Sequence, residues 1–277
     1  MTSGRESFFK LPWSGQLQTL MRNDDHFFVL KMDMAIEDAW QTIPEEMASR
    51  IIGNVKSGNQ RSALWEMFVW MKLTGGNRRV EYETDSENSK NRLDFKVTTT
   101  SGYEFFVEAK SFGPSESDLV NETTDAPGEI VCHIRSRLKS SLKQIKDYKD
   151  KPVILAFANS FSGITGTKFQ FLSILFGKPG VRIHLDTNLV ENVITDLGFY
   201  LSDSEFNTNF DGVIFHDGFA PGFSTFNDPC LWLNPNSNSQ FDFTQLGWEM
   251  DIYKAEGGKI WKTNLSCDFK WLENSIY

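Results

Sequence analysis

A short segment, residues 93–110, constrains the fold of this chain more than any other. It reads LDFKVTTTSGYEFFVEAK, and apolar side chains alternate with polar ones in its first half: Leu93, Phe95 and Val97 against Asp94, Lys96 and Thr98. This period of two predicts a strand with one apolar face. Ser101-Gly102 predicts a tight turn, and a second strand is expected at about residues 103–110. The segment therefore predicts a β-hairpin.

The hairpin carries three charged side chains that it would bring together. Glu108 and Lys110 point to the same face of the second strand, because side chains alternate along a strand. If the two strands pair antiparallel, Asp94 joins them in one patch. Two carboxylates and one ammonium in close contact are costly unless another group compensates them, and a divalent cation would do so. The simpler alternative is an exposed cross-strand ion pair, which stabilises by less than about 1 kcal/mol.

A fourth charged residue lies in the most clearly defined helix, residues 60–74. Asn59 is a suitable N-cap, and Gly75-Gly76 predicts the end of the helix. Apolar side chains cover nearly its whole circumference, so we expect a buried helix with Glu66 in its middle. A buried carboxylate is costly unless it is paired, protonated or bound to a metal. The sequence leaves open whether an interior Arg or Lys, or a metal ion, compensates Glu66.

The other segments of the first half predict helices around a sheet. Residues 1–56 are expected to form an N-terminal helical extension that packs as a layer, with Pro44 in the first turn of its second helix. Residues 78–83 predict a strand, and an amphipathic helix is expected at about residues 129–148. The continuous apolar run at residues 153–158 is typical of a strand in the centre of a sheet.

The last part of the chain, residues 160–277, is expected to complete or flank the sheet. The patterns predict helices at residues 168–176 and 191–200, strands at 181–185 and 212–215, a loop at 221–243, and a return to the sheet edge at 247–277. With residues 57–159 as the core, the chain is expected to be one domain over residues 1–277. Its fold class is α/β, bordering on α+β, with a mixed central sheet flanked by helices and a peripheral C-terminal region.

Composition limits the compartment and the partners of the chain. The net charge of −9 argues against a nucleic-acid partner, but residues 183–253 hold eleven acidic side chains and no Lys or Arg, while residues 135–151 hold seven Lys or Arg and two acidic side chains. One stretch can therefore face a polyanion while the other repels it or only aids solubility. Residues 1–15 lack the apolar stretch typical of a signal peptide, and the sequence has no apolar run of membrane-spanning length and no Cys-x-x-Cys pair. These patterns predict a soluble, cytoplasmic protein without a membrane partner.

Together these residues resemble the PD-(D/E)XK nuclease superfamily, whose members share the restriction-endonuclease-like fold. The resemblance covers about residues 57–159, with Glu66 on a helix, Asp94 on a strand and Glu108-Ala109-Lys110 on the next strand. The order of elements is helix, strand, strand, strand, helix, strand. Residues 144–148 add the Gln-x-x-x-Tyr pattern of some members. Leu93 departs from the proline in the family motif.

The resemblance implies an endonuclease that depends on Mg²⁺ or Mn²⁺ and hydrolyses phosphodiester bonds, with DNA favoured over RNA. Asp94, Glu108 and the Ala109 carbonyl would hold the ion, because hard dications prefer oxygen ligands. The ion would lower the pKa of a bound water and polarise the phosphate. Lys110 would orient that water and stabilise the transition state. Glu66 would bind through water or help to hold a second ion.

The resemblance also implies nucleic-acid contacts on the helix at residues 129–148. Gln144 and Tyr148 would line the site, although Tyr148 also belongs to the apolar face and can be a core residue. Three lysines on another face of this helix would contact the phosphate backbone: Lys139, Lys143 and Lys146.

A non-catalytic binding or assembly module on the same fold is the alternative. The acidic stretch at residues 183–253 suits a basic protein partner, and a second copy of the chain is also compatible with the sequence. The complete set of acids with Lys110 argues against this alternative, because a binding module has no need of Lys110 beside two carboxylates.

Overall fold

The structure is a computed structural model that describes most of the chain. The described residues are 5–14, 18, 30–85, 91–112, 127–148, 151–159, 174–175, 178–184, 186, 189–196, 210–216, 229–237, 239, 241–256, 259–264 and 270–271. The helix expected at residues 168–176 lies outside them except for residues 174–175. Among the described residues, no helix combines the length and apolar character needed to cross a membrane.

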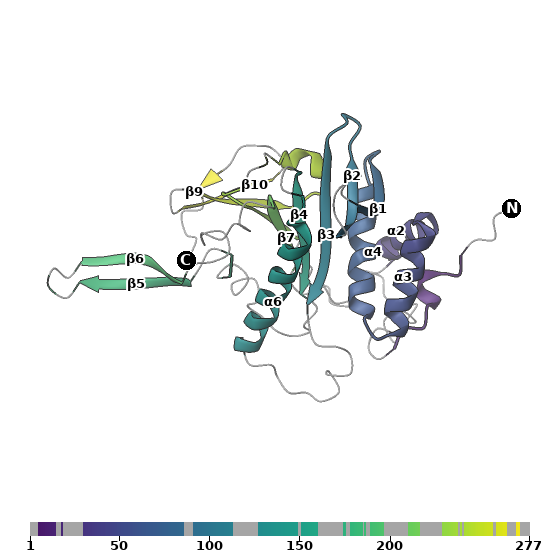
Figure 1. Ribbon diagram of the computed structural model, residues 1–277, viewed down its shortest axis with the longest axis horizontal. Coiled ribbons are helices and arrows are strands. Elements are labelled where there is room, and N and C mark those ends of the chain that lie inside the picture. Colours follow the sequence, from purple (N-terminus) through teal and green to yellow (C-terminus); the bar gives the residue numbers. More distant parts are fainter. Residues whose placement is uncertain are drawn as a thin grey trace.

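A mixed sheet forms the centre of the fold (Figure 1). Within the described residues it has nine strands, in the spatial order β1-β2-β3-β4-β7-β8-β9-β10-β11. Their bounds are β1 Arg79–Asp85, β2 Arg92–Thr98, β3 Glu104–Phe112, β4 Val153–Asn159, β7 Gly212–His216, β8 Cys230–Leu233, β9 Asp251–Glu256, β10 Lys259–Asn264 and β11 Lys270–Trp271. The pairs β3–β4, β4–β7 and β8–β9 are parallel, and the other neighbours are antiparallel.

The middle of this sheet is covered on both faces. Every residue of β4 and of β7 is buried, as expected for strands that lie between two layers. The strands expected at residues 153–158 and 212–215 are therefore confirmed. The C-terminal part of the chain continues the sheet from β7 to β11. The division of residues 1–277 into an extension, a core and a C-terminal part stays a prediction.

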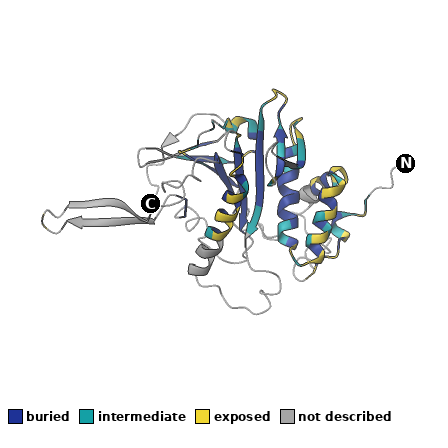
Figure 2. Ribbon diagram, viewed as in Figure 1, coloured by how far each residue is buried: buried dark blue, intermediate teal, exposed yellow. Residues whose placement is uncertain are grey.

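Helices lie on the two faces of the sheet (Figure 1). The long helices are α2 Leu30–Thr42, α3 Glu45–Lys56, α4 Gln60–Thr74 and α6 Pro127–Ile145, and two short 3₁₀ turns are η1 Phe8–Lys10 and η3 Phe243–Leu246. The bounds of α4 agree with the expected helix, and Pro44 is the N-cap of α3 rather than part of its first turn. The surfaces of α3 and of α6 from Ile134 onward that face away from the sheet are exposed, whereas α4 is mostly buried (Figure 2).

Alternate residues of β3 pack against different helices. Phe105, Val107 and Ala109 belong to the core cluster that contains α4, whereas Phe106 belongs to the cluster that contains the buried side chains of α6. The sheet is therefore enclosed between α4 on one face and α6 on the other. This mixed α/β architecture, with a mixed sheet flanked by helices, confirms the coarse fold class expected from the sequence.

The hairpin at residues 93–110 is confirmed, but one detail of its pattern is wrong. β2 and β3 pair antiparallel, yet Leu93 lies in the α6 cluster while Phe95 and Val97 lie in the α4 cluster. A regular strand would place all three on one face. The backbone register between β2 and β3 ends at the pair Phe95 and Val107, so β2 leaves the regular ladder at Asp94.

Two expectations for the C-terminal part are wrong. The helix expected at residues 191–200 is instead the strand β6, Leu189–Asp196, which pairs antiparallel with β5, Lys178–His184, in a separate two-stranded sheet. Its Val, Ile and Thr residues favour a strand. The loop expected at residues 221–243 contains β8, whose apolar run is inserted between β7 and β9.

Candidate active site

A tight turn sets the geometry of the hairpin that carries the candidate site. The Gly102 amide donates to the Thr99 carbonyl at 3.0 Å, and Gly102 has a φ of 82°, which glycine adopts without steric cost. The turn fixes the register in which Phe95 lies opposite Val107. Asp94 and Glu108 are the next residues along the two strands, so the turn brings them face to face.

The Asp94 carboxylate takes the place of a backbone partner where β2 separates from β3. The Ala109 amide donates to Asp94 Oδ2 at 2.8 Å, and the Asp94 amide donates to Glu108 Oε2 at 3.3 Å. Both backbone donors are thus satisfied by carboxylates, as buried amides require. Asp94 and Glu108 are buried, with 4% and 1% of their surfaces exposed.

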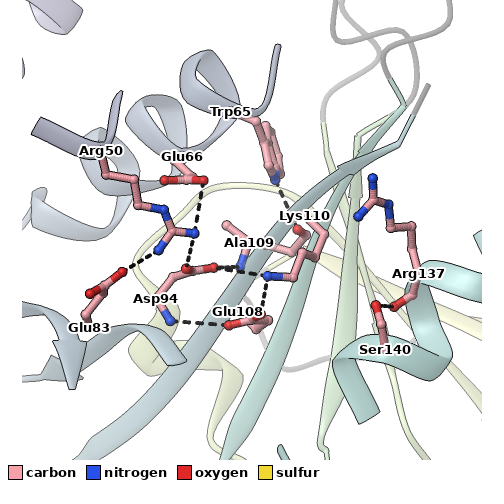
Figure 3. Close-up of polar contacts among 11 residues, drawn as sticks. Arg50, Trp65, Glu66, Glu83, Asp94, Glu108, Ala109, Lys110, Arg137 and Ser140 are labelled. Atoms are coloured by element: carbon pink, nitrogen blue, oxygen red, sulfur yellow. Dashed lines mark hydrogen bonds and ion pairs between the residues drawn. The ribbon is translucent and has the colours of Figure 1, made fainter. Parts of the chain in front are cut away.

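Lys110 lies beside both of these acids. Its ammonium forms an ion pair with Glu108 Oε1 and lies 4.0 Å from Asp94 Oδ2, as Figure 3 shows. Burial alone would lower the pKa of Lys110, but the charges of Asp94 and Glu108 outweigh it and hold that pKa above its ordinary value. Lys110 therefore carries a positive charge in this site.

Glu66 reaches the site from α4, on the helical side of the sheet. The preceding residue, Trp65, donates from its indole N–H to the Ala156 carbonyl of β4 at 3.0 Å, which anchors this turn of the helix to the sheet. Glu66 is buried, as the sequence predicts. Burial, and then the charge of Asp94, raises the pKa of Glu66 to about 8, and the same two causes raise the pKa of Glu108 to about 8.

Arg50 is a site residue that sequence reasoning missed. It comes from α3, and its Nη2 lies 3.3 Å from Asp94 Oδ1 and 3.6 Å from Glu66 Oε1 (Figure 3). Its Nη1 donates to Glu83 Oε1 at 2.5 Å. Glu66 thus has an arginine partner, although this arginine is partly exposed and not interior. No local signal distinguishes Arg50 in the sequence, because it lies 16 positions before Glu66 in a segment that reads as packing.

The donor set suits a hard divalent cation at Asp94 and Glu108. These side chains offer carboxylate oxygens next to Ala109. With Glu66, the site holds three acids against two cations, Arg50 and Lys110. Glu66 Oε2 is also buried without a hydrogen-bond partner. Among the described residues, however, no three His, Cys, Asp or Glu side chains are gathered into a group that could hold a metal ion. Arg50 lies between Glu66 and Asp94 and contacts both.

The predicted nucleic-acid residues of α6 differ in their exposure. Lys139, Lys143 and Lys146 are exposed, and Gln144 is partly exposed. Tyr148 lies beyond the end of α6 and is buried against Phe106, with ring centroids 5.0 Å apart. Its hydroxyl donates to the Asn91 carbonyl at 3.0 Å. Tyr148 thus occupies the core position that the sequence left open for it.

Comparisons with known proteins give no relative for this chain. No protein-family model, curated protein or solved structure matches it. The site must therefore be interpreted from its own geometry.

Proposed function

We propose that this protein is a nuclease that depends on Mg²⁺ or Mn²⁺ and hydrolyses phosphodiester bonds, with DNA as the favoured substrate. The order α4-β1-β2-β3-α6-β4 along the chain supports a restriction-endonuclease-like core. So does the sheet order β1-β2-β3-β4, in which β3 and β4 are parallel. Fold alone does not define an activity, so the proposal depends on the site.

One observation carries the proposal. Asp94, Glu108 and Lys110 meet where β2 separates from β3, and all three are largely withdrawn from solvent. Buried acids in excess of their cationic partners are unfavourable in a purely structural role. Perturbed pKa values of the kind found at Glu66 and Glu108 are typical of functional sites.

Each residue of the site would have a separate role in hydrolysis. Asp94 and Glu108, with the Ala109 carbonyl, would hold the divalent ion, which supplies Lewis-acid charge and lowers the pKa of a bound water. Lys110 stays protonated beside both carboxylates. Its ammonium can therefore orient the attacking water and offset the negative charge that develops on the phosphate. Glu66 is a further acid at the side of the site next to α4, and the positive charge of the ion would favour its ionised form.

The exposed lysines of α6 and of the turn after it would contact the phosphate backbone of the substrate. Lys139 and Lys143 are four residues apart on one side of α6, and Lys146 follows in the turn directly after the helix. Such lysines bind phosphates without reading the sequence of the bases.

A non-catalytic assembly module is the second candidate, and one observation favours it. Arg50 and Lys110 already pair with Asp94, Glu108 and Glu66, so an ion-pair network without a metal can hold this region together. A basic protein or a second copy of the chain would then be the partner.

The two candidates are separated by a cleavage assay. Supercoiled plasmid, single-stranded DNA and RNA are incubated with Mg²⁺, Mn²⁺ or EDTA. We expect cleavage that EDTA abolishes, and a loss of about 100-fold or more in Asp94→Ala and in Lys110→Ala. Lys96→Ala is the matched control, because Lys96 is also an ion-paired lysine of the hairpin but pairs with Glu104 outside the site. Equal activity of the wild type, Asp94→Ala and Lys110→Ala would reject the nuclease.

A further inference from the structure

We infer that Arg50 is a resident counter-cation, which pairs with Glu66 and Asp94 in the metal-free protein and keeps only its contact with Glu83 when a divalent ion binds. This inference rests on the proposed function, because it assumes a metal ion at Asp94. It assigns to Arg50 control over metal affinity. Arg50 would then be a positioning residue that does not itself contact the substrate.

The Arg50 guanidinium lies where a metal ion at Asp94 would also lie. A single nitrogen, Nη2, lies between two carboxylates that come from α4 and β2, at 3.6 Å from Glu66 and 3.3 Å from Asp94. Arg50 therefore places a positive charge between two acids, as a metal ion bound at this place would. Two cations cannot share these oxygens without strong repulsion at such short range. Metal binding at Asp94 must therefore displace Arg50 or weaken its contacts.

Glu83 is the partner that Arg50 can keep when it leaves the two buried acids. Its Oε1 accepts from Arg50 Nη1 at 2.5 Å, the shortest of the three contacts. Glu83 lies on β1 with a φ of 48°, a left-handed conformation that is unfavourable for a residue other than glycine. Unfavourable backbone conformations persist where the surrounding contacts hold them in place, and the contact with Arg50 is one such contact.

The partial exposure of Arg50 and Glu83 allows the Arg50 guanidinium to move away from the buried acids. The Arg50 side chain is 35% exposed and Glu83 is 31% exposed, whereas Glu66 and Asp94 are 3% and 5% exposed. The guanidinium also lies over the Tyr82 ring, with its Cζ 5.9 Å from the ring centroid. Arg50 thus lies at the rim of the site, and it can leave the buried acids while it keeps Glu83 as a partner.

The test measures the dissociation constant for Mn²⁺ by calorimetry on the full chain, without any substrate. In Arg50→Gln we expect Mn²⁺ to bind about tenfold more tightly than in the wild type, since its competitor is gone. In Glu83→Gln we expect binding to weaken by about threefold or more, because Arg50 is then held by Glu66 and Asp94 alone. Arg79→Gln and Glu81→Gln are the matched controls, because they alter another ion pair of β1; each should change the constant by less than about twofold.

The double variant Arg50→Gln/Glu83→Gln distinguishes displacement of Arg50 by the metal ion from a general effect of the charge of Glu83. If Glu83 acts through Arg50, Glu83→Gln has less than about a twofold effect in the Arg50→Gln background. An undiminished effect in that background would overturn the inference, as would equal affinities in Arg50→Gln and the wild type, and both results leave the metal site intact. If neither the wild type nor Arg50→Gln binds Mn²⁺, the proposed function fails together with the inference. Should Arg50→Gln not fold, weaker Mn²⁺ binding in Glu83→Gln but not in the two β1 controls supports the inference, and equal constants in Glu83→Gln and the wild type overturn it.

Discussion

At the scale of single residues, Glu66 and Glu108 show how burial couples this site to pH. Burial and the charge of Asp94 raise both pKa values to about 8, whereas both groups titrate at the ordinary value of 4.5 in the unfolded chain. Between these two values the folded state binds more protons than the unfolded state. Stability must then fall as the pH rises through this window.

The metal-free protein in EDTA should therefore unfold at lower urea concentration at pH 8 than at pH 5.5. Glu66→Gln removes one of the two groups, and we expect it to reduce this pH dependence by about half. Chemical unfolding at a series of pH values measures the effect. Glu45→Gln is the control, because Glu45 is 82% exposed. The same pH dependence in Glu66→Gln as in the wild type would contradict the assignment.

At the scale of elements, α6 combines a packing face with a charged face. Ile134, Leu138, Leu142 and Ile145 are buried in one core cluster, while Lys139, Lys143 and Lys146 are exposed. The lysines therefore contribute little to packing, and their removal should leave the fold unchanged. The helix, with the turn that holds Lys146, can present three positive charges to a polyanion in spite of the negative net charge of the chain.

Replacement of Lys139, Lys143 and Lys146 by alanine should weaken duplex DNA binding in EDTA. If all three contact phosphates, the slope of log affinity against log salt should become shallower by about 2 to 3. Fluorescence anisotropy with a labelled duplex at several salt concentrations measures both quantities. The charge-matched control replaces Lys10, Lys56 and Arg79, which are also exposed. An equal loss in both triple variants would show that α6 is not the binding surface.

At the scale of the whole molecule, the acidic C-terminal stretch has structural as well as electrostatic roles. Asp211 is one of its eleven acids, yet it is buried. It accepts from the Val153 amide at 2.7 Å and from the Ser237 hydroxyl at 2.6 Å. These contacts join the start of β4 to the segment before β7 and to the chain after β8. Part of this stretch is therefore a structural element of the sheet and not a solvated surface.

The parts of the fold that local patterns specify could be predicted from the sequence. The helix α4 has a continuous apolar surface and a Gly75-Gly76 stop, and the β2–β3 hairpin has alternation and a glycine turn. The burial of Glu66 follows from the same local pattern. For this reason Asp94, Glu108 and Lys110 could be placed together before the structure was known.

Contacts between distant segments could not be predicted. Arg50 meets Asp94 and Glu66 only because α3 packs against α4, and no short motif encodes that contact. The four residues of β8 are too few to show a period, so pairing with β7 and β9 determines their conformation. In β6, β-branched residues outweighed an apparent helical spacing.

The most direct test of the central claim is a crystal structure of the protein soaked with Mn²⁺, with anomalous scattering to locate the ion. The account predicts one strong peak about 2.1 Å from an oxygen of Asp94 and from an oxygen of Glu108, with Arg50 farther from Asp94 than 3.3 Å. A structure without an ion at this place, in which Arg50 and Lys110 keep their present contacts with the acids, would contradict it.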